Sequence, residues 1–425
     1  MTDNASPNKS GPLSGYRVLE LCSTVSGPAC ARLLGDFGAD VIKVEPPDGD
    51  PLRSMGKHVG DVSLYAATIL RNKRSISVDL KHPTGRQLVR ELALKCDLLV
   101  DSYRPGVMER LGLGYEELSK ENPGLVMVRI SGYGQSGPYS QRPGYGAICE
   151  AMAGVRNLIG DPDRPPARVA VAATDYLTAV FAAFGAVTAL LARRQTGRGQ
   201  VVDAALYEAA FTQMEAYVPA FETTGYVPQR VGPNLPNMAP NSLYQTRDNG
   251  YVLIAANSDA TFERLIVTMG QPELKHDPLL CSIRVRGNNI PYCNEVVSAW
   301  TRQHDGVDIE RMLLAAEVPV SRVYTMHDIF ADPHFAARGM LTRVPHPQLG
   351  ELVHPGIVPR LSDTPGRIVK SGPDLGQDTR TILADELGLS ESEIDDLFDQ
   401  KIVHGMVASC DQAGHESYAS KPKAD

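Results

Sequence analysis

The stretch Val171-Ala-Ala-Thr-Asp-Tyr-Leu177, with the apolar run from Thr178 to Ala192 behind it, organises the rest of the chain. Thr174 is a favourable N-cap residue, and the run ends in Arg193-Arg-Gln-Thr-Gly197, which places cations in a last turn before a glycine stop. The pattern predicts a helix, and its almost entirely apolar body predicts that the helix is buried. Asp175 would then be a single carboxylate in the first turn, facing the positive end of the helix dipole. Such a residue is most often an ordinary first-turn Asp, so the rest of the chain has to decide its role.

Length and charge narrow the class of protein. The chain has 425 residues, enough for two domains and a large core. Its hydrophobic content of 43% and charged content of 22% are typical of a soluble globular protein. The formal net charge of −8 argues against non-specific nucleic-acid binding, which needs a basic surface. Small anionic ligands stay possible, because a local cluster of Arg and Lys outweighs the global charge.

Cysteine usage and hydropathy predict a cytoplasmic protein that does not enter a membrane. The seven cysteines are scattered and form no CxxC pair, which fits a reducing compartment and provides no disulfide framework and no zinc site. We expect no stretch to reach the roughly 18 apolar residues of a membrane span. The polar start, Met1 to Gly11, does not have the pattern of a signal peptide.

Short apolar runs alternate with helical patterns through the first half of the chain. We predict strands at residues 17–21, 39–45, 72–80, 97–101, 125–130 and 200–206. Predicted helices cover residues 27–37, 83–95 and 207–221, besides the helix that carries Asp175. Strands of this length that alternate with helices indicate an α/β fold with a doubly wound, parallel sheet.

The order of these patterns also predicts domains. Residues 1–12 are expected to be a disordered lead-in, and residues 13–221 the N-terminal, Rossmann-like part of a large domain. A smaller α/β domain is placed at 222–325, after a long passage rich in Gly, Pro and Asn. It has predicted strands at 242–245 and 250–256 and helices near 258–269, 292–303 and 307–316. Residues 326–403, with a polar helix near 390–400, would return to the large domain, and residues 404–425 would be a disordered tail.

The run Gly132-Tyr-Gly-Gln-Ser-Gly137 follows a predicted strand and matches G-x-G-x-x-G. A dinucleotide site needs a helix to begin inside the glycines, whereas Pro138, Pro143 and Gly144 come next. We therefore interpret this run as a binding or active-site loop, not as an NAD site.

The distribution of histidines limits the chemistry of the first half. None of the ten histidines lies between His82 and His276, so the part of the chain that holds the helix with Asp175 supplies no imidazole base. It also has no Walker A loop, no HExxH motif and no His pair at metal-ligand spacing, and we expect no metal. Carboxylate, backbone-amide and guanidinium chemistry remain. A carboxylate at a helix N-terminus is suited to attack an activated acyl group.

Several stretches, taken together and in order, resemble the class III coenzyme A transferases of the CaiB/BaiF type, the family of formyl-CoA:oxalate and carnitine CoA-transferases. The resemblance covers about residues 12–403. The matching stretches are Pro12-Leu-Ser-Gly-Tyr-Arg-Val-Leu-Glu-Leu21, Gly27-Pro28, Gly38-Ala-Asp-Val-Ile-Lys-Val-Glu45, Asn72-Lys-Arg-Ser75, Thr196-Gly-Arg-Gly-Gln200, Val318-Pro-Val320, Asp332-Pro333, Gly376-Gln-Asp-Thr379 and Glu386-Leu-Gly388.

The resemblance implies an enzyme that moves coenzyme A from an acyl-CoA, commonly of the succinyl-CoA type, to a small carboxylic acid. The family's nucleophile is an Asp near the start of a helix, followed by an apolar stretch and TGxGQ, and Asp175 matches it. The implied reaction is ping-pong, through an aspartyl–acyl anhydride and an aspartyl–CoA thioester. CoA thioesters are then substrates, and no permanently bound cofactor is expected. The family also implies an interlocked homodimer, with no nucleic-acid or membrane partner.

The same resemblance implies a set of binding residues. Backbone N–H groups of the loop at 232–242 are candidates for binding the oxyanion. Tyr145 matches a tyrosine near the nucleophile. The CoA-binding positions that match are Thr24, Val25, Asn72, Lys73, Arg74, Ser102, Tyr103, Arg104 and Arg110.

This chain departs from the family pattern in places. Pro46 stands where relatives often have a basic residue, Gly146 where they have an acidic one, and Glu150 where Gln is common. The loop at 232–242 lacks the glycine run of the oxalate-type enzymes, which argues against oxalate as the acceptor. A dicarboxylate acceptor is favoured instead by loop arginines that offer a guanidinium to a second carboxylate, namely Arg53, Arg142, Arg164 and Arg168.

Two other functions remain open at this point. The family contains α-methylacyl-CoA racemases and CoA-dependent lyases; the racemases use a His and an Asp as a pair of bases. The racemase His belongs where this chain has Tyr145, so two-base racemisation is disfavoured. A CoA-binding regulator without enzymatic activity would require Asp175 to be turned away from the cleft.

Overall fold

The computed structural model describes residues 11–405, and these form two compact units. The first unit contains the described parts of Met1–Pro143, Asp175–Ala205 and Arg343–Asp425. The second contains Gly144–Thr174 and Leu206–Thr342, so the chain enters it twice, whereas the sequence placed a single excursion at 222–325. The predicted disordered lead-in and tail lie almost entirely outside the described residues.

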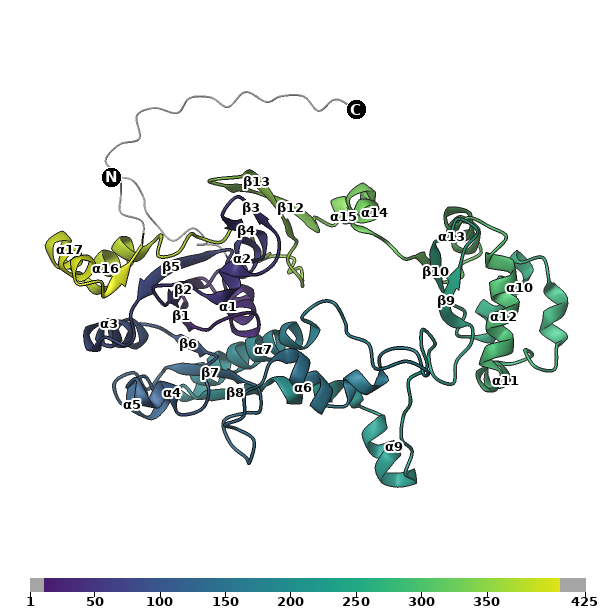
Figure 1. Cartoon of the computed structure of the whole chain (residues 1–425), viewed down its shortest axis with the longest axis horizontal. Helices are drawn as coiled ribbons and strands as arrows, with labels where there is room; N and C mark the ends of the chain where they lie inside the picture. Colours follow the sequence, from purple (N-terminus) through teal and green to yellow (C-terminus); the bar gives the residue numbers. More distant parts are fainter. Residues whose placement is uncertain (1–10, 406–425) are drawn as a thin grey trace. The chain divides into compact units, whose positions relative to one another are not determined.

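A seven-stranded sheet forms the centre of the first unit, in the order β14-β5-β2-β1-β6-β7-β8 (Figure 1). All neighbouring strands are parallel except β14, which pairs antiparallel with β5. The strands are β1 (Arg17–Leu21), β2 (Asp40–Glu45), β5 (Lys73–Val78), β6 (Leu98–Asp101), β7 (Val126–Ser131), β8 (Val201–Ala205) and β14 (Val403–His404). The predicted parallel sheet is confirmed. It could be predicted because strands buried on both faces appear in the sequence as short, continuous apolar runs.

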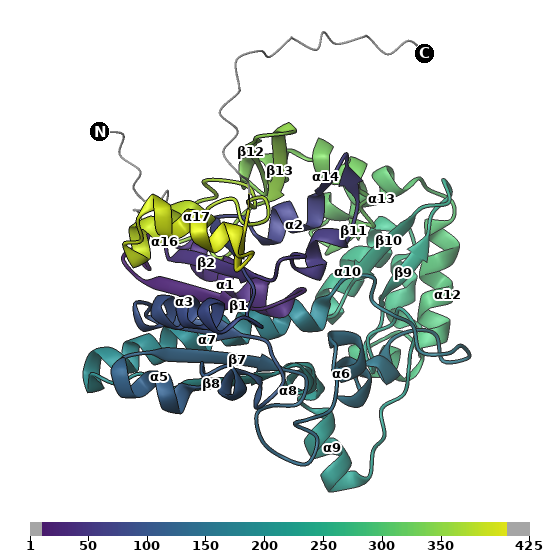
Figure 2. The same cartoon turned by 60° about the vertical axis from the view of Figure 1, so that its left-hand side comes forward.

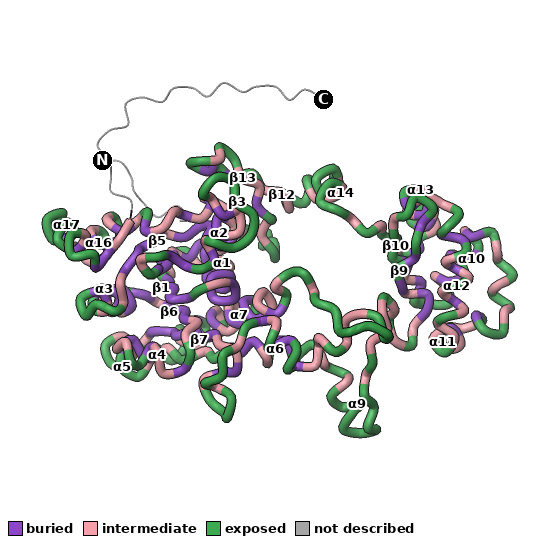
Figure 3. Tube along the Cα trace, in the orientation of Figure 1, coloured by how far each residue is buried: buried purple, intermediate pink, exposed green. Residues whose placement is uncertain are grey.

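Helices cover both faces of this sheet, whose strands are largely buried (Figure 3). On one face α1 (Ser26–Asp36) and α7 (Ala173–Thr196) pack against the strands. On the other lie α3 (Pro83–Leu94), α4 (Val107–Arg110), α5 (Tyr115–Glu121), α16 (Thr379–Leu387) and α17 (Glu391–Asp399). Helix α16 contacts α3, and the two lie on the same side of the sheet (Figure 2). The remaining elements are α2 (Leu64–Ile69) and the hairpins β3 (His58–Val59) with β4 (Val62–Ser63) and β12 (Leu341–His346) with β13 (Gly350–Pro355).

Helix α7 differs from its prediction at its start. It begins at Ala173, one residue before the predicted cap, so Thr174 lies inside the first turn. Its packed face is built from small residues, because Gly185 approaches the sheet so closely that a Cβ atom would come within 2.6 Å of Val202 Cγ1. The buried residues on this face are Ala179, Ala182, Ala186, Ala189 and Leu190.

The opposite face of α7 is exposed, so the prediction of a helix buried all round is wrong. Phe184 is 70% exposed, and Val180, Phe181 and Leu191 are also exposed. The expectation that no stretch is long and apolar enough for a membrane span is wrong as well, because α7 passes that test by length and composition, with a mean hydropathy of 1.6. A single such helix is weak evidence for a membrane, and the alanine face of α7 packs in a protein core.

The second unit has its own sheet, with strand order β11-β10-β9 and antiparallel pairing. Its core includes residues of α10, α12 and α13, as the predicted strands and helices suggested. The predicted helix at 207–221 is instead broken, because Glu215 has a φ of 23°. The elements are α6 (Gly146–Met152), α8 (Leu206–Phe211), α9 (Tyr217–Thr224), β9 (Asn241–Gln245), β10 (Tyr251–Ala255), α10 (Asp259–Thr268), α11 (Ile283–Asn288), α12 (Ile290–Thr301), α13 (Gly306–Ala315), β11 (Val320–Arg322), α14 (Met326–Ala331) and α15 (Pro333–Ala337).

Candidate functional site

Asp175 lies where parallel sheets commonly bind ligands. Helix α7 leads into β8, which pairs in parallel with β7, so the helix runs against the direction of the strands. Its first turn, with Asp175 as the acidic residue, therefore lies at the carboxyl edge of the sheet. The loop that follows β7 lies at the same edge, as do the loops that follow β1, β2 and β6.

The carboxyl group of Asp175 is partly buried and has no cationic partner among the described residues. No ion pair to Asp175 is found within 4.0 Å in the part of the chain that the structure describes. Burial raises the pKa of Asp175 to about 6, and only the backbone N–H of the same residue opposes this shift. The sequence suggested that the helix N-terminus would favour the ionised form, but desolvation outweighs that effect. At neutral pH the group is still mostly ionised, and it is a poorly solvated carboxylate.

Two tyrosines and one arginine accompany Asp175, and sequence analysis missed them. Tyr65 on α2 shares a hydrogen bond with Tyr176, and its phenol pKa is raised by burial and then by Tyr176 and Asp175. Arg32 on α1 lies with its Cζ atom 5.6 Å from the centroid of the Tyr176 ring. Tyr65 is far from Asp175 in sequence and belongs to no motif, so only the fold brings the two residues together.

The predicted CoA-binding residues Thr24, Val25 and Ser102 lie together at the ends of β1 and β6. Thr24 has a left-handed backbone, with φ of 65°, and its N–H donates to Asp50 Oδ1 at 3.0 Å. The N–H of Ser23 donates to Ser102 Oγ at 3.0 Å, which ties the two loops together. Val25 precedes α1 with its side chain buried and supplies no side-chain cap to that helix. The first turn of α1 is therefore a favourable place for an anion.

Tyr103, Arg104 and Arg110 follow β6 at the same edge. The N–H of Tyr103 donates to Asp101 Oδ1 at 3.2 Å, and burial raises the pKa of Asp101 to about 7 against the opposing effect of Arg129. Arg104 and Arg110 are exposed, and within residues 11–405 neither guanidinium forms an ion pair. These two groups remain available for a phosphate.

Asn72, Lys73 and Arg74 are placed differently from the prediction. Asn72 Nδ2 donates to Asp36 and to the carbonyl of Arg367, and Lys73 is fully buried. The guanidinium of Arg74 is held by carboxylates, including Glu386 Oε1 at 2.8 Å. Strand β5 lies between β2 and β14 of the C-terminal segment, so these side chains form contacts inside the first unit. A direct phosphate contact from Lys73 does not fit this position.

Tyr145, Glu150 and the loop at 232–242 belong to the second unit. Tyr145 precedes α6 and is 70% exposed. The Glu150 carboxylate, which replaces the expected Gln, pairs with Arg156 Nε at 2.6 Å. In the loop at 232–242, Asn234 Oδ1 accepts from Asn294 Nδ2 at 2.7 Å, so this loop is bonded to α12.

The four loop arginines that the sequence suggested differ in their partners. Arg53 is bidentate to Glu45 at 2.7 Å, so its guanidinium is not available to a substrate carboxylate. Arg164 lies 3.8 Å from Asp161, and Arg168 is exposed. The Cζ atom of Arg142 lies 3.4 Å from the centroid of the Tyr139 ring, and among the described residues it has no acidic partner.

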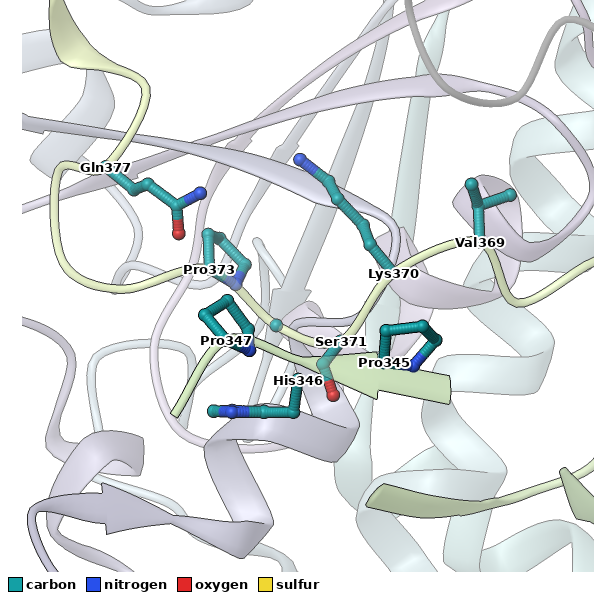
Figure 4. Close-up of a pocket in the computed structure, with 9 residues that line it drawn as sticks. Pro345, His346, Pro347, Val369, Lys370, Ser371, Pro373 and Gln377 are labelled. Carbon is teal, nitrogen blue, oxygen red and sulfur yellow. The ribbon is translucent and has the colours of Figure 1, made fainter. Parts of the chain in front are cut away.

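A separate hollow of about 310 Å³ lies between the β12–β13 hairpin and the C-terminal segment (Figure 4). His346, Lys370, Ser371 and Gln377 are among its lining residues. Ser371 Oγ lies 2.7 Å from Nε2 of the buried His354, whose pKa burial lowers to about 4. None of the predicted site residues lines this hollow, and no carboxylate does.

The fold defines a doubly wound α/β protein, with Asp175 at the carboxyl edge of its parallel strands. The family model for CoA-transferase family III matches residues 13–379. The chain therefore belongs to CoA-transferase family III and is an enzyme of that family.

Curated relatives span almost the whole chain. It is 45% identical over 385 residues to the succinyl-CoA–D-citramalate CoA-transferase of Chloroflexus aurantiacus. This alignment covers 90% of this chain and 96% of that protein. It is 38% identical over 398 residues to the beta subunit of the succinyl-CoA–L-malate CoA-transferase of the same organism, covering 92% of this chain and 98% of that subunit.

A solved structure has a similar fold. The crystal structure of a CaiB/BaiF family protein from Brucella suis superposes with a TM-score of 0.80 at 32% identity. The match covers 89% of this chain and 100% of that one. The fold predicted from the resemblance is thus the fold of the family.

Proposed function

We propose that this enzyme transfers coenzyme A from succinyl-CoA to a small dicarboxylic acid, with Asp175 as the nucleophile. The observation that carries the proposal is the environment of Asp175, a partly buried carboxylate in the first turn of α7. Its pKa is raised to about 6, and within residues 11–405 it has no cationic partner. A desolvated carboxylate is more reactive than a hydrated one and is still ionised at neutral pH. The donor is taken from relatives that are named succinyl-CoA transferases.

The reaction balances without a cofactor. The Asp175 carboxylate attacks the thioester carbonyl, a C–O bond forms, the C–S bond breaks, and CoA leaves as a thiolate. That thiolate attacks the aspartyl carbonyl of the anhydride, releases succinate and leaves an aspartyl–CoA thioester. The acceptor carboxylate then displaces the thiolate, and the thiolate attacks the acceptor's acyl carbon to regenerate Asp175. A carboxylate enters and a carboxylate leaves, so no proton is needed overall.

Tyr65 is the proposed hydrogen-bond donor to the negative charge that develops on the tetrahedral intermediates. Its raised pKa keeps the phenol protonated beside Asp175. A fixed donor in a water-poor site stabilises an oxyanion without reorganisation. Tyr145 and the loop at 232–242 belong to the second unit, and their roles stay predictions from the family resemblance.

Coenzyme A is proposed to bind along the carboxyl edge of the first unit. The uncapped first turn of α1, entered through Thr24 and Val25, suits the diphosphate. Arg104 and Arg110 are exposed and suit a phosphate, while Ser102 and Tyr103 lie beside them. Asn72, Lys73 and Arg74 are assigned to contacts inside the first unit and not to the ligand.

The acceptor is proposed to carry a second carboxylate. The relatives named for D-citramalate and L-malate act on dicarboxylic acids. Of the four arginines that the sequence suggested, Arg142 is oriented by Tyr139, lacks an acidic partner among the described residues and lies in the loop after β7, at the same edge as Asp175. It is therefore our candidate for the second carboxylate.

We also propose a homodimer, which the exposed apolar face of α7 supports. Large apolar side chains such as Phe184 that stand together on a surface mark an interaction site. A mass measured by light scattering at the value of one chain would contradict this. A cytoplasmic location is inferred from the free thiols of the described cysteines, and cell fractionation tests it.

The test combines exchange and trapping. Wild-type enzyme with succinyl-CoA and a panel of mono- and dicarboxylic acids is expected to form a new acyl-CoA with the dicarboxylates, detected by mass spectrometry. Hydroxylamine is expected to convert residue 175 to the hydroxamate only when acyl-CoA is present. Asp175→Ala should lose at least 10³-fold in activity. Full activity of that variant, or α-deuterium incorporation without acyl exchange, would falsify the transferase assignment.

A further inference from the structure

The loop at residues 22–28 rests on a network of buried charges. Lys43 Nζ lies 3.0 Å from Glu20 Oε1, 2.8 Å from Asp50 Oδ2 and 2.9 Å from the carbonyl oxygen of Cys22. The side chains of Lys43 and Glu20 are 0% exposed. The contacts to Glu20 and to the Cys22 carbonyl are hydrogen bonds, and the contact to Asp50 is an ion pair.

A second buried lysine holds the other end of the same loop. Lys73 Nζ lies 2.6 Å from Glu20 Oε2 and donates at 2.7 Å to the carbonyl oxygen of Pro28. Glu20 thus lies between the two lysines and binds each with one oxygen. Because the carbonyl groups of Cys22 and Pro28 both accept from these lysines, each end of the loop is bonded to a buried lysine.

Asp50 anchors the middle of the loop. Its Oδ1 accepts from the N–H of Thr24 at 3.0 Å and from that of Leu52 at 2.9 Å, while Oδ2 meets Lys43. Thr24 has a φ of 65°, which is unfavourable for a β-branched residue and needs support from its surroundings. Asp50 in turn is held through its own N–H by Glu45 Oε2 at 3.2 Å.

This arrangement fixes geometry more than it adds stability. Buried ion pairs return little net free energy, because desolvation offsets their attraction, but the removal of one partner is costly. The left-handed turn at Thr24 directs the chain into α1, whose first turn has no side-chain cap. The network therefore determines where the free N–H groups of α1 point.

We propose that Asp50 and Lys43 are positioning residues for the binding of coenzyme A, acting through the backbone of Thr24 and the first turn of α1. The inference rests on the proposed function, since it assumes that the CoA diphosphate binds there. Neither residue needs to touch the ligand. The expected consequence is an effect on affinity for CoA and on KM for the acyl-CoA, with little effect on the chemical step at Asp175.

The test is Asp50→Asn, which keeps the shape of the side chain but removes its charge. The dissociation constant for free coenzyme A, measured by calorimetry, is expected to rise about tenfold or more, with a similar rise in KM for succinyl-CoA and a kcat within a few-fold of wild type. The matched control is Asp36→Asn, because Asp36 is an equally buried carboxylate that pairs with Arg71 at 2.7 Å and does not contact the loop. That variant is expected to lose stability but to keep its affinity for CoA.

A second variant guards against a folding failure of Asp50→Asn. Thr24→Pro leaves every buried charge in place, but proline has no N–H for Asp50 and cannot adopt a φ of 65°. It is expected to weaken CoA binding at least as much, with a smaller change in Tm. Unchanged affinity in both variants, or equal losses in Asp50→Asn and Asp36→Asn, would overturn the positioning role. Failure of the wild-type enzyme to bind CoA would instead overturn the proposed function, and the inference with it.

Discussion

Asp50 and Asp175 are the same chemical group at the same edge of one sheet, yet their surroundings are opposite. Asp50 is buried among a lysine ammonium group and two backbone N–H groups. Asp175 has no cation within 4.0 Å among the described residues, and burial raises its pKa to about 6. A carboxylate whose charge is neutralised by neighbours is held in one place and is unreactive. One that is desolvated and left without a partner is poised to attack a carbonyl.

The two environments should therefore respond in opposite ways to the loss of charge. Removing charge near Asp50 leaves other buried charges without a partner, which destabilises the fold. Removing the charge of Asp175 relieves a desolvation cost, while it removes the proposed nucleophile.

The largest expected effect is the loss of stability in Lys43→Met, which removes the cation that pairs with Asp50. Methionine fills a similar volume but leaves Glu20 and Asp50 buried without this cation, so the free energy of unfolding should fall by about 3–5 kcal/mol. Urea denaturation followed by circular dichroism measures it. Arg90→Met is the control, since Arg90 pairs with the exposed Glu121 and the loss there should stay below about 1 kcal/mol. Similar losses in the two variants would contradict the account of the buried network.

The next effect concerns the neighbour of the unpaired carboxylate. Tyr65→Phe removes the phenol donor beside Asp175 and should lower kcat by about 10²-fold, with little change in CoA affinity. Steady-state kinetics with calorimetric CoA binding separates the two quantities. Tyr16→Phe is the control, because Tyr16 packs against the core between the sheet and helices α1 and α7, as Tyr176 does, but its ring faces Arg193. If kcat for Tyr65→Phe stays within twofold of wild type, the oxyanion role falls to other donors.

The sequence predicted the sheet better than the surroundings of these carboxylates, for a physical reason. Strands such as β1 and β6 are buried on both faces, so each is visible as a continuous apolar run. Asp175 was singled out by its place ahead of an apolar stretch and TGxGQ. Tyr65 and Asp50 belong to no motif, and the matching stretch that contains Lys43 does not reveal its partner, because each contact joins segments that only the fold brings together.

Helix α7 shows the same limit in a different form. Its hydropathy alone predicts burial all round, but the face that packs on the sheet consists of small residues, which allow close approach. The larger side chains, such as Phe181 and Phe184, project from the other face. Apolar content cannot distinguish a face that meets its own sheet from one that is open to a partner. The spacing of Ala and Gly along the helix was the available signal.

The smallest expected effect is a gain in stability from Asp175→Asn. The folded-state pKa of Asp175 is raised above its ordinary value near 3.8, so between about pH 4 and pH 6 the folded protein binds more protons than the unfolded chain. This group therefore costs stability as pH rises through that window, and the cost is fully present above about pH 6. Asparagine cannot ionise and avoids it.

We expect Asp175→Asn to melt a few degrees above the wild type at pH 8, with the difference shrinking toward zero at pH 4. Differential scanning fluorimetry at both pH values measures it. Asp50→Asn serves as the contrast, because loss of a charge that is already paired should lower Tm at pH 8. If both variants lower Tm at pH 8 by the same amount, Asp175 is as well satisfied as Asp50, and the case for Asp175 as a desolvated, reactive carboxylate fails on thermodynamic grounds, independently of any activity assay.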